Sequence, residues 1–184
     1  ASGNANLFLI NPNGIVFGEN SRLDIGGSFF ASTAESILFE DGFKYSAIVS
    51  QQEPLLTISV PVGLQIGVNP GEIKVNGTGH NLIQASFLAP LKRSQNNSNL
   101  QVKLGKTLAL VGGEINLNGG ILTTEAGNVE LGSVREGTVN LNQTNQGFEL
   151  DYAGVTKFRD IQISQRSLID ANGINTGSVI VHGK

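Results

Sequence analysis

Apolar and polar residues alternate along most of this chain in short stretches, and no helical stripe interrupts them. Alternation with a period of two is typical of strands that bury one face. Asn-Gly turn signals separate the stretches at 13–14, 76–77, 118–119 and 172–173. The apolar positions are Leu7 and Leu9, Ile15 and Phe17, Leu23 and Ile25, Leu64 and Ile66, Ile73 and Val75, Val102 and Leu104, Leu108 and Leu110, Ile115 and Leu117, Ile121, Val129 and Leu131, Val139 and Leu141, Phe148 and Leu150, Ile161 and Ile163, Leu168, Ile174, and Val179 and Val181. The pattern predicts an all-β chain of three- to five-residue strands.

The spacing of these pairs bears on the choice between an antiparallel sandwich and a parallel β-helix. Three steps from pair to pair add up to about 20 residues, as from Leu110 to Leu131 (21), Ile163 to Val181 (18) and Leu9 to Phe29 (20). A repeat of that length favours a single-stranded solenoid with three short strands in each coil. We therefore expect a parallel β-helix.

One long stretch, residues 34–62, breaks this period. Residues 37–39 can face residues 43–47 across the turn at 40–42, which predicts a β-hairpin. An apolar segment, 55–62, follows with a proline before it and another near its end. We expect this insertion to lie outside the coils.

A second break, residues 87–99, contains Lys92-Arg93 and the polar run 94–99, and predicts a loop or hairpin tip. The whole chain, 1–184, is then one β-helix domain with two insertions. Neither end shows a cap, so we expect a domain truncated at both ends, monomeric but with sheet edges open to association.

Composition explains the corners of such a coil and removes several classes of function. The chain has 24 Gly and 19 Asn, the residues that enter positive φ at the lowest cost. Only 15% of residues are charged and the net charge is −3, which disfavours a coiled coil, a disordered chain and a nucleic-acid partner. The absence of Cys excludes disulfides and thiolate chemistry, and no apolar run approaches the ~18 residues that span a bilayer.

The run Asn6–Gly18, NLFLINPNGIVFG, resembles the two-partner secretion domain, which is the N-terminal haemagglutination-activity domain of filamentous haemagglutinins. The match is carried by the NPNGI motif, Asn11, Pro12, Asn13, Gly14 and Ile15. Stretches similar to the same family follow in order at 23–34, 61–67, 108–113 and 129–134. The family's second motif, NPNL, is not present.

The resemblance implies a right-handed parallel β-helix at the start of a large exoprotein of Gram-negative bacteria. Its partner would be a dedicated outer-membrane transporter, whose periplasmic domains bind the chain and whose barrel exports it to the medium or cell surface. Folding would then nucleate at this domain outside the cell. An adhesive, haemagglutinin-like surface that binds host or cell-surface glycans through the full-length protein is the alternative.

The motif is also explained by turn chemistry alone. Pro12 fixes φ for the second turn position, Asn13 tolerates the third, and Gly14 can leave in a left-handed conformation. The Asn11 side chain can bond back to the turn backbone. A fold-forming role and direct contact with the transporter both remain open.

A polysaccharide-active enzyme is the third reading, because β-helices also host such sites. Its acids would be Asp151, Asp160 with Arg159, or Asp170 with Arg166. We expect these to be solvated or corner positions and expect no enzyme, catalytic residue or cofactor. The sequence Thr78-Gly79-His80 has no paired acids nearby, and neither His has a partner at metal-ligand spacing.

Overall fold

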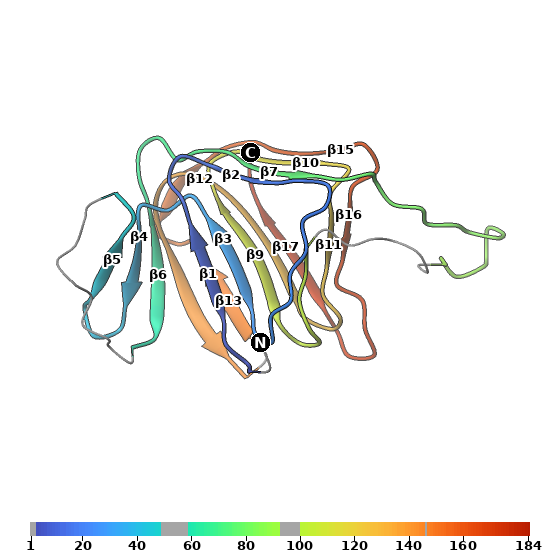
Figure 1. Cartoon of the computed structure of the whole chain (residues 1–184), viewed down its shortest axis with the longest axis horizontal. Helices are drawn as coiled ribbons and strands as arrows, with labels where there is room; N and C mark the ends of the chain where they lie inside the picture. Colours follow the sequence, from blue (N-terminus) through green and yellow to red (C-terminus); the bar gives the residue numbers. More distant parts are fainter. Residues whose placement is uncertain (1–2, 49–58, 93–99, 146) are drawn as a thin grey trace.

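The computed structural model describes residues 3–48, 59–92, 100–145 and 147–184. This part of the chain is all-β and contains seventeen strands and no helix (Figure 1). The strands are β1 (Leu7–Ile10), β2 (Ile15–Phe17), β3 (Phe29–Ser32), β4 (Ser36–Phe39), β5 (Lys44–Ser46), β6 (Pro61–Ile66), β7 (Ile73–Asn76), β8 (Leu100–Gln101), β9 (Thr107–Gly112), β10 (Ile115–Asn118), β11 (Ile121–Thr123), β12 (Asn128–Thr144), β13 (Gly147–Asp151), β14 (Val155–Phe158), β15 (Ile161–Ser164), β16 (Leu168–Asp170) and β17 (Ser178–His182).

Most strands belong to three parallel sheets that the chain visits in turn. The first parallel sheet contains β1, β3, β9, the start of β12, and β17. The second contains β2, β7, β10 and β15, and the third contains β8, β11 and β16. In Figure 1 the second sheet crosses the top of the molecule while the strands of the first lie side by side below it. The arrangement is consistent with a β-helix-like fold.

The register shows which of the predicted repeats are real. Leu131 is the register partner of Leu110, so that 21-residue step leads from one strand of the first parallel sheet to its parallel neighbour, as a β-helix repeat requires. The 20-residue step from Leu9 to Phe29 is wrong, because Leu9 pairs with Ala31. The 18-residue step is also wrong, since it joins β15 of the second sheet to β17 of the first. The steps between register partners in the first parallel sheet are unequal, from 21 residues between Leu108 and Val129 to 79 between Phe29 and Leu108, because insertions lie between some of the strands.

The side chains that point into the coils form the inner core. In the first parallel sheet one column of register partners consists of Leu7, Phe29, Leu108, Val129 and Val179. The other two sheets face this column with apolar residues of their own, and Leu23 and Ile25, expected as a strand, pack on this core without forming one. The buried members are Ile15, Phe17, Phe29, Ala31, Ile73, Val75, Leu100, Val102, Leu108, Leu110, Ile115, Leu117, Leu122, Val129, Leu131 and Ala171.

An antiparallel layer, the cover, packs on the outer face of the first parallel sheet. It consists of β4, β5, β6, the second half of β12, β13 and β14. β4 and β5 form the expected hairpin, with Ile37 opposite Tyr45. Between cover and sheet lies the outer core, made of Phe30, Ala34, Ile37, Leu64, Ile66, Ala109, Val111, Val134, Val139, Leu141, Phe148, Tyr152 and Val155.

The cover corrects part of the strand prediction. The apolar pairs at 64/66, 139/141 and 148/150 were expected to be coil strands, but they lie in β6, β12 and β13 and pair antiparallel. An alternating strand has the same pattern in either direction, so periodicity alone could not distinguish the two.

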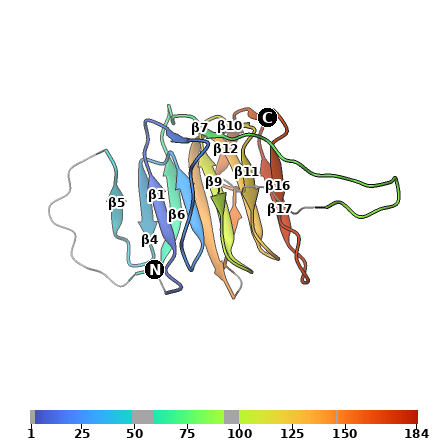
Figure 2. The same ribbon diagram turned by 45° about the vertical axis from the view of Figure 1, so that its right-hand side comes forward.

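An arm, residues 77–92, projects from the end opposite β5 (Figure 2). Its only ladder contact is an isolated antiparallel bridge between Ile83 and Lys92. The Gln84 side-chain amide donates to the carbonyls of Phe87 and Ala89, which holds a turn at the tip. The predicted segment at 55–62 and the polar run 94–99 fall wholly or largely outside the described residues.

Candidate functional site

The motif Asn11–Ile15 forms the corner between β1 and β2. The Asn11 carbonyl accepts a hydrogen bond from the Gly14 amide at 3.1 Å, and its side-chain Oδ1 accepts one from the Asn13 amide, also at 3.1 Å. Gly14 has a φ of 120°, a region open to glycine. The turn is therefore built as the sequence chemistry indicates.

This corner sits directly on a second Asn-Pro-Gly corner at residues 69–71. The Gly71 amide donates to the Pro12 carbonyl at 2.8 Å, and the Ile15 amide donates to the Glu72 carbonyl at 3.0 Å. A Cβ on Gly71 would lie 2.4 Å from the Asn13 carbonyl carbon, so the two turns can touch only because residue 71 is a glycine. The stacking of the turn at Asn11–Gly14 on the corner at Asn69–Gly71 was not anticipated from the sequence.

The corners continue as a column through the later coils. A Cβ on Gly113 would lie 2.4 Å from the Pro70 carbonyl oxygen, and the Ser133 hydroxyl donates to the Gly113 carbonyl at 2.8 Å. The motif occupies the N-terminal end of this column. Ile15 is buried there, whereas Asn11 and Asn13 are exposed.

Sequence reasoning missed the two ionisable side chains whose buried polar atoms lack partners. Glu130 on β12 and Tyr152 after β13 lie on the outer-core side of the first sheet. Neither Glu130 oxygen nor the Tyr152 hydroxyl makes a hydrogen bond of standard geometry. Burial raises the pKa of Glu130 to about 7, helped by Glu149 and opposed by the Leu150 backbone N–H. Burial, with Glu130 as a second cause, also raises the pKa of Tyr152.

Comparison with known protein families decides the assignment. The TPS secretion domain family matches residues 1–183. The chain belongs to this family. The match confirms the resemblance found at Asn11–Ile15 and downstream, while no curated protein and no solved structure matches the chain.

Membership carries general implications for this TPS secretion domain. The family is one of two-partner secretion, so it implies interaction with a partner transporter and belongs to secreted exoproteins of Gram-negative bacteria. It is not an enzyme family.

The acids considered for catalysis lie in separate parts of the TPS secretion domain. Asp151 ends β13 and accepts hydrogen bonds from the Ala153 amide at 2.9 Å and the Asn140 side chain at 3.2 Å. These two donors, the Ala153 amide first, hold the pKa of Asp151 below its usual range. Asp160 instead lies at the corner column, in a hollow of about 370 Å³ that Arg135 and Arg159 also line.

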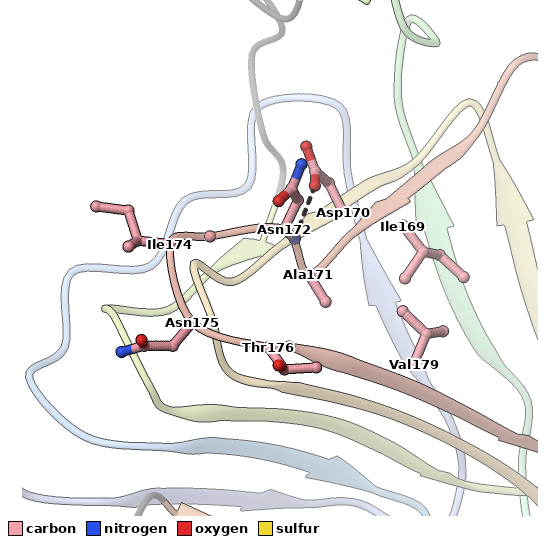
Figure 3. A pocket seen from close by; sticks show the side chains of 10 residues that line it. Ile169, Asp170, Ala171, Asn172, Ile174, Asn175, Thr176 and Val179 are labelled. Atoms are coloured by element: carbon pink, nitrogen blue, oxygen red, sulfur yellow. Dashed lines mark hydrogen bonds between the residues drawn. The ribbon is translucent and has the colours of Figure 1, made fainter.

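The third acid, Asp170, is engaged in its own loop. Its Oδ1 accepts a hydrogen bond from the Asn172 amide at 3.0 Å, as Figure 3 shows. Arg166 does not join it but donates to the His80 carbonyl and to Asn81 Oδ1, which ties the base of the arm to the turn before β16. In the candidate set of Asp170 with Arg166, the two side chains therefore make these bonds to different partners.

The described residues also bear on metal binding and on membrane insertion. No group of three His, Asp or Glu in this part of the chain is placed to hold a metal ion. No helix within the same ranges is long and apolar enough to cross a membrane.

Proposed function

We propose that this chain is the secretion module of a two-partner-secreted exoprotein, recognised by its cognate outer-membrane transporter. Its full fold would be a right-handed parallel β-helix solenoid that nucleates folding outside the cell, after passage through the periplasm and outer membrane of a Gram-negative bacterium. The family match over residues 1–183 carries this proposal.

The stacked register supports folding coil by coil. Each strand of the first parallel sheet pairs in register with the strand one coil away, as in Leu108 with Val129 and Leu110 with Leu131. A completed coil offers its edge and its apolar column to the next coil, so each addition depends mainly on its neighbour. Coil stacking outside the cell can then bias the chain toward export.

Export of the unaltered chain tests the proposal. The chain, carrying its downstream passenger, is produced in a Gram-negative host with and without the cognate transporter, and the medium is assayed for the intact protein. Release only with the transporter is the expected result. Equal release in both strains, or none in either while the chain is stable, overturns the proposal.

We further propose that the corner Asn11–Ile15 shapes the fold and that Asn13 is the residue of the motif most available for contact. Asn11 Oδ1 accepts a hydrogen bond within the turn, and Ile15 packs in the inner core, while Asn13 is exposed. Asn11→Ala should therefore lower stability by about 1 kcal/mol, as loss of a local side-chain to backbone bond does. Asn13→Ala should leave stability within about 0.5 kcal/mol.

Secretion of the same two variants separates the roles. A fold-forming motif loses export in proportion to lost stability, so Asn13→Ala is exported normally. Loss of export in a stable Asn13→Ala variant would instead assign the motif to direct contact with the transporter. Asn142→Ala, at an exposed Asn on the cover, is the matched control and should be exported normally.

An adhesive surface is the second candidate, favoured by the outer face of the second parallel sheet. No strand of the cover pairs with this sheet. Lys74, Asn116 and Gln162 are register partners there, so amide and ammonium groups repeat at strand spacing. Such a row can bond to the hydroxyls of a glycan. Binding of the purified domain to a glycan array, lost in Asn116→Ala, would support this candidate, and no binding would remove it.

A further inference from the structure

Glu130 occupies an outward position in the first parallel sheet. Its neighbours along β12, Val129 and Leu131, belong to the inner core, so the alternation of the strand turns Glu130 toward the cover. Its register partners there are Ala109 on β9 and Ile180 on β17. A charged residue is thus placed in a row of apolar side chains.

The cover closes completely over this carboxyl group. Glu130 is 0% exposed, and neither of its oxygens makes a hydrogen bond of standard geometry, although the Leu150 backbone N–H partly favours the charged form. Burial in apolar surroundings disfavours an ionised carboxylate far more than the neutral acid. The closed cover therefore favours the protonated form.

Among the described residues, neither Lys nor Arg acts on Glu130 or Tyr152. From the cover, Tyr152 lies beside Glu130, and its buried hydroxyl also lacks a partner. Glu149 on β13 is exposed and acts on Glu130 only through its charge. From β17, His182 lies behind Tyr152, with the two ring centres 4.2 Å apart. The partners on β9 and β17 are apolar. The negative charge of Glu149 thus opposes ionisation of Glu130, and Glu130 in turn opposes ionisation of Tyr152.

We propose that Glu130 is a proton-operated latch: the cover closes over its neutral carboxylic acid and loosens when that proton is lost. Loss of the proton should loosen the packing of the outer core and leave the packing of the inner core unchanged. It is a regulatory property of the fold and does not depend on the proposed secretion role.

The direction of the pH effect follows from linkage. In the unfolded chain the pKa of Glu130 is near its ordinary 4.5, and in the closed state it is raised to about 7. Between these values the unfolded chain has released the proton and the closed state still holds it. The equilibrium constant for unfolding therefore rises with pH by up to about tenfold per unit, and it is flat with respect to this group outside the window.

Urea unfolding between pH 4 and 8.5 tests the latch with three proteins: the unaltered chain, Glu130→Gln, and the control Glu125→Gln at an exposed position nearby. Glu130→Gln keeps the size of the side chain but cannot titrate. Between pH 5 and 7 the unfolding equilibrium constant of the unaltered chain and of the control should rise with pH. For Glu130→Gln this rise should be smaller by a factor of up to about ten per pH unit. Equal slopes in all three proteins overturn the proposal.

Hydrogen exchange at pH 7.5 locates the effect. Amides of β13 should be better protected in Glu130→Gln than in the unaltered chain, and amides of β10 should be unchanged. Equal protection of β13 in the two proteins contradicts the latch.

The titration of Glu130 itself gives a test without substitution, in case Glu130→Gln does not fold. In the unaltered protein, the ¹³C chemical shift of the Glu130 carboxyl should move with a midpoint well above 4.5 and near 7. A midpoint near 4.5 overturns the proposal.

Discussion

The inner and outer cores lie on opposite faces of the same parallel sheet, yet they are built differently. The buried inner core contains only apolar side chains, aligned in register from coil to coil. The outer core is filled from a separate antiparallel layer and adjoins the buried Glu130 and the Tyr152 hydroxyl. Because apolar side chains repeat in register in the inner core, a polar side chain there would lack a partner. The outer core instead adjoins ionisable groups whose effect on stability depends on pH.

The two cores also differ in what fixes them. Inner residues are held by neighbours one coil away, which is the arrangement that allows sequential folding. Outer residues need β4, β6, β13 and β14 to assemble against a sheet already formed. We expect the inner core to carry the secretion-coupled folding and the outer core to adjust its stability.

The largest effect should follow a charge placed in the inner core. Leu110 is 0% exposed, so Leu110→Asp buries an unpaired carboxylate and removes apolar contacts. A loss above about 5 kcal/mol is expected, enough to abolish the folded domain. Circular dichroism and urea unfolding measure it.

Val16→Asp is the matched control for that substitution, because Val16 on β2 is 66% exposed. Its stability should change by less than about 0.5 kcal/mol. A folded Leu110→Asp protein with native stability would contradict the conclusion that the inner core stabilises the domain.

A cavity in the outer core should have the next largest effect. Phe30 is buried and stacks on Phe8 with ring centres 4.3 Å apart, and it meets Phe148 edge-on at 5.0 Å. Phe30→Ala should cost about 3–5 kcal/mol, with hydrogen exchange rising first in the cover. Phe87→Ala on the exposed arm should be nearly neutral. Loss of protection in β10 before β13 would contradict the separation of the two cores.

The smallest effect should come from the Tyr152 hydroxyl. It is buried without a partner, so Tyr152→Phe removes an unsatisfied polar group while keeping the ring that packs on His182. Stability at pH 7 should be unchanged or higher by up to about 1 kcal/mol. A loss of more than 1 kcal/mol in urea unfolding would show that the hydroxyl is hydrogen-bonded in solution.

Much of the inner core could be predicted from the sequence, because the alternation of residues such as Leu108 and Leu110 directly encodes which side chains point inward. The turn at Asn11–Gly14 was predictable for a similar reason, since its hydrogen bonds are local. The cover was only partly predictable. The β4–β5 hairpin has a short-range turn signal, but β13 and the second half of β12 share their alternation with coil strands.

The latch at Glu130 was not predictable at all. An acidic residue at an outward strand position ordinarily faces water. Glu130 is buried only because β13 and Tyr152, which come later in the chain, pack over that position. The stacking of Gly71 on Asn13 was missed for a similar reason, since the insertion at residues 34–62 separates the two residues in the sequence.

The central claim is that folding of the stacked coils supports export through the transporter. The most direct measurement is the rate at which the full chain reaches the medium in a transporter-producing host, compared between the unaltered protein, Leu110→Asp and Val16→Asp and normalised to the chain synthesised. The account predicts slower release of Leu110→Asp and an unchanged rate for Val16→Asp. Equal rates for all three proteins would contradict it.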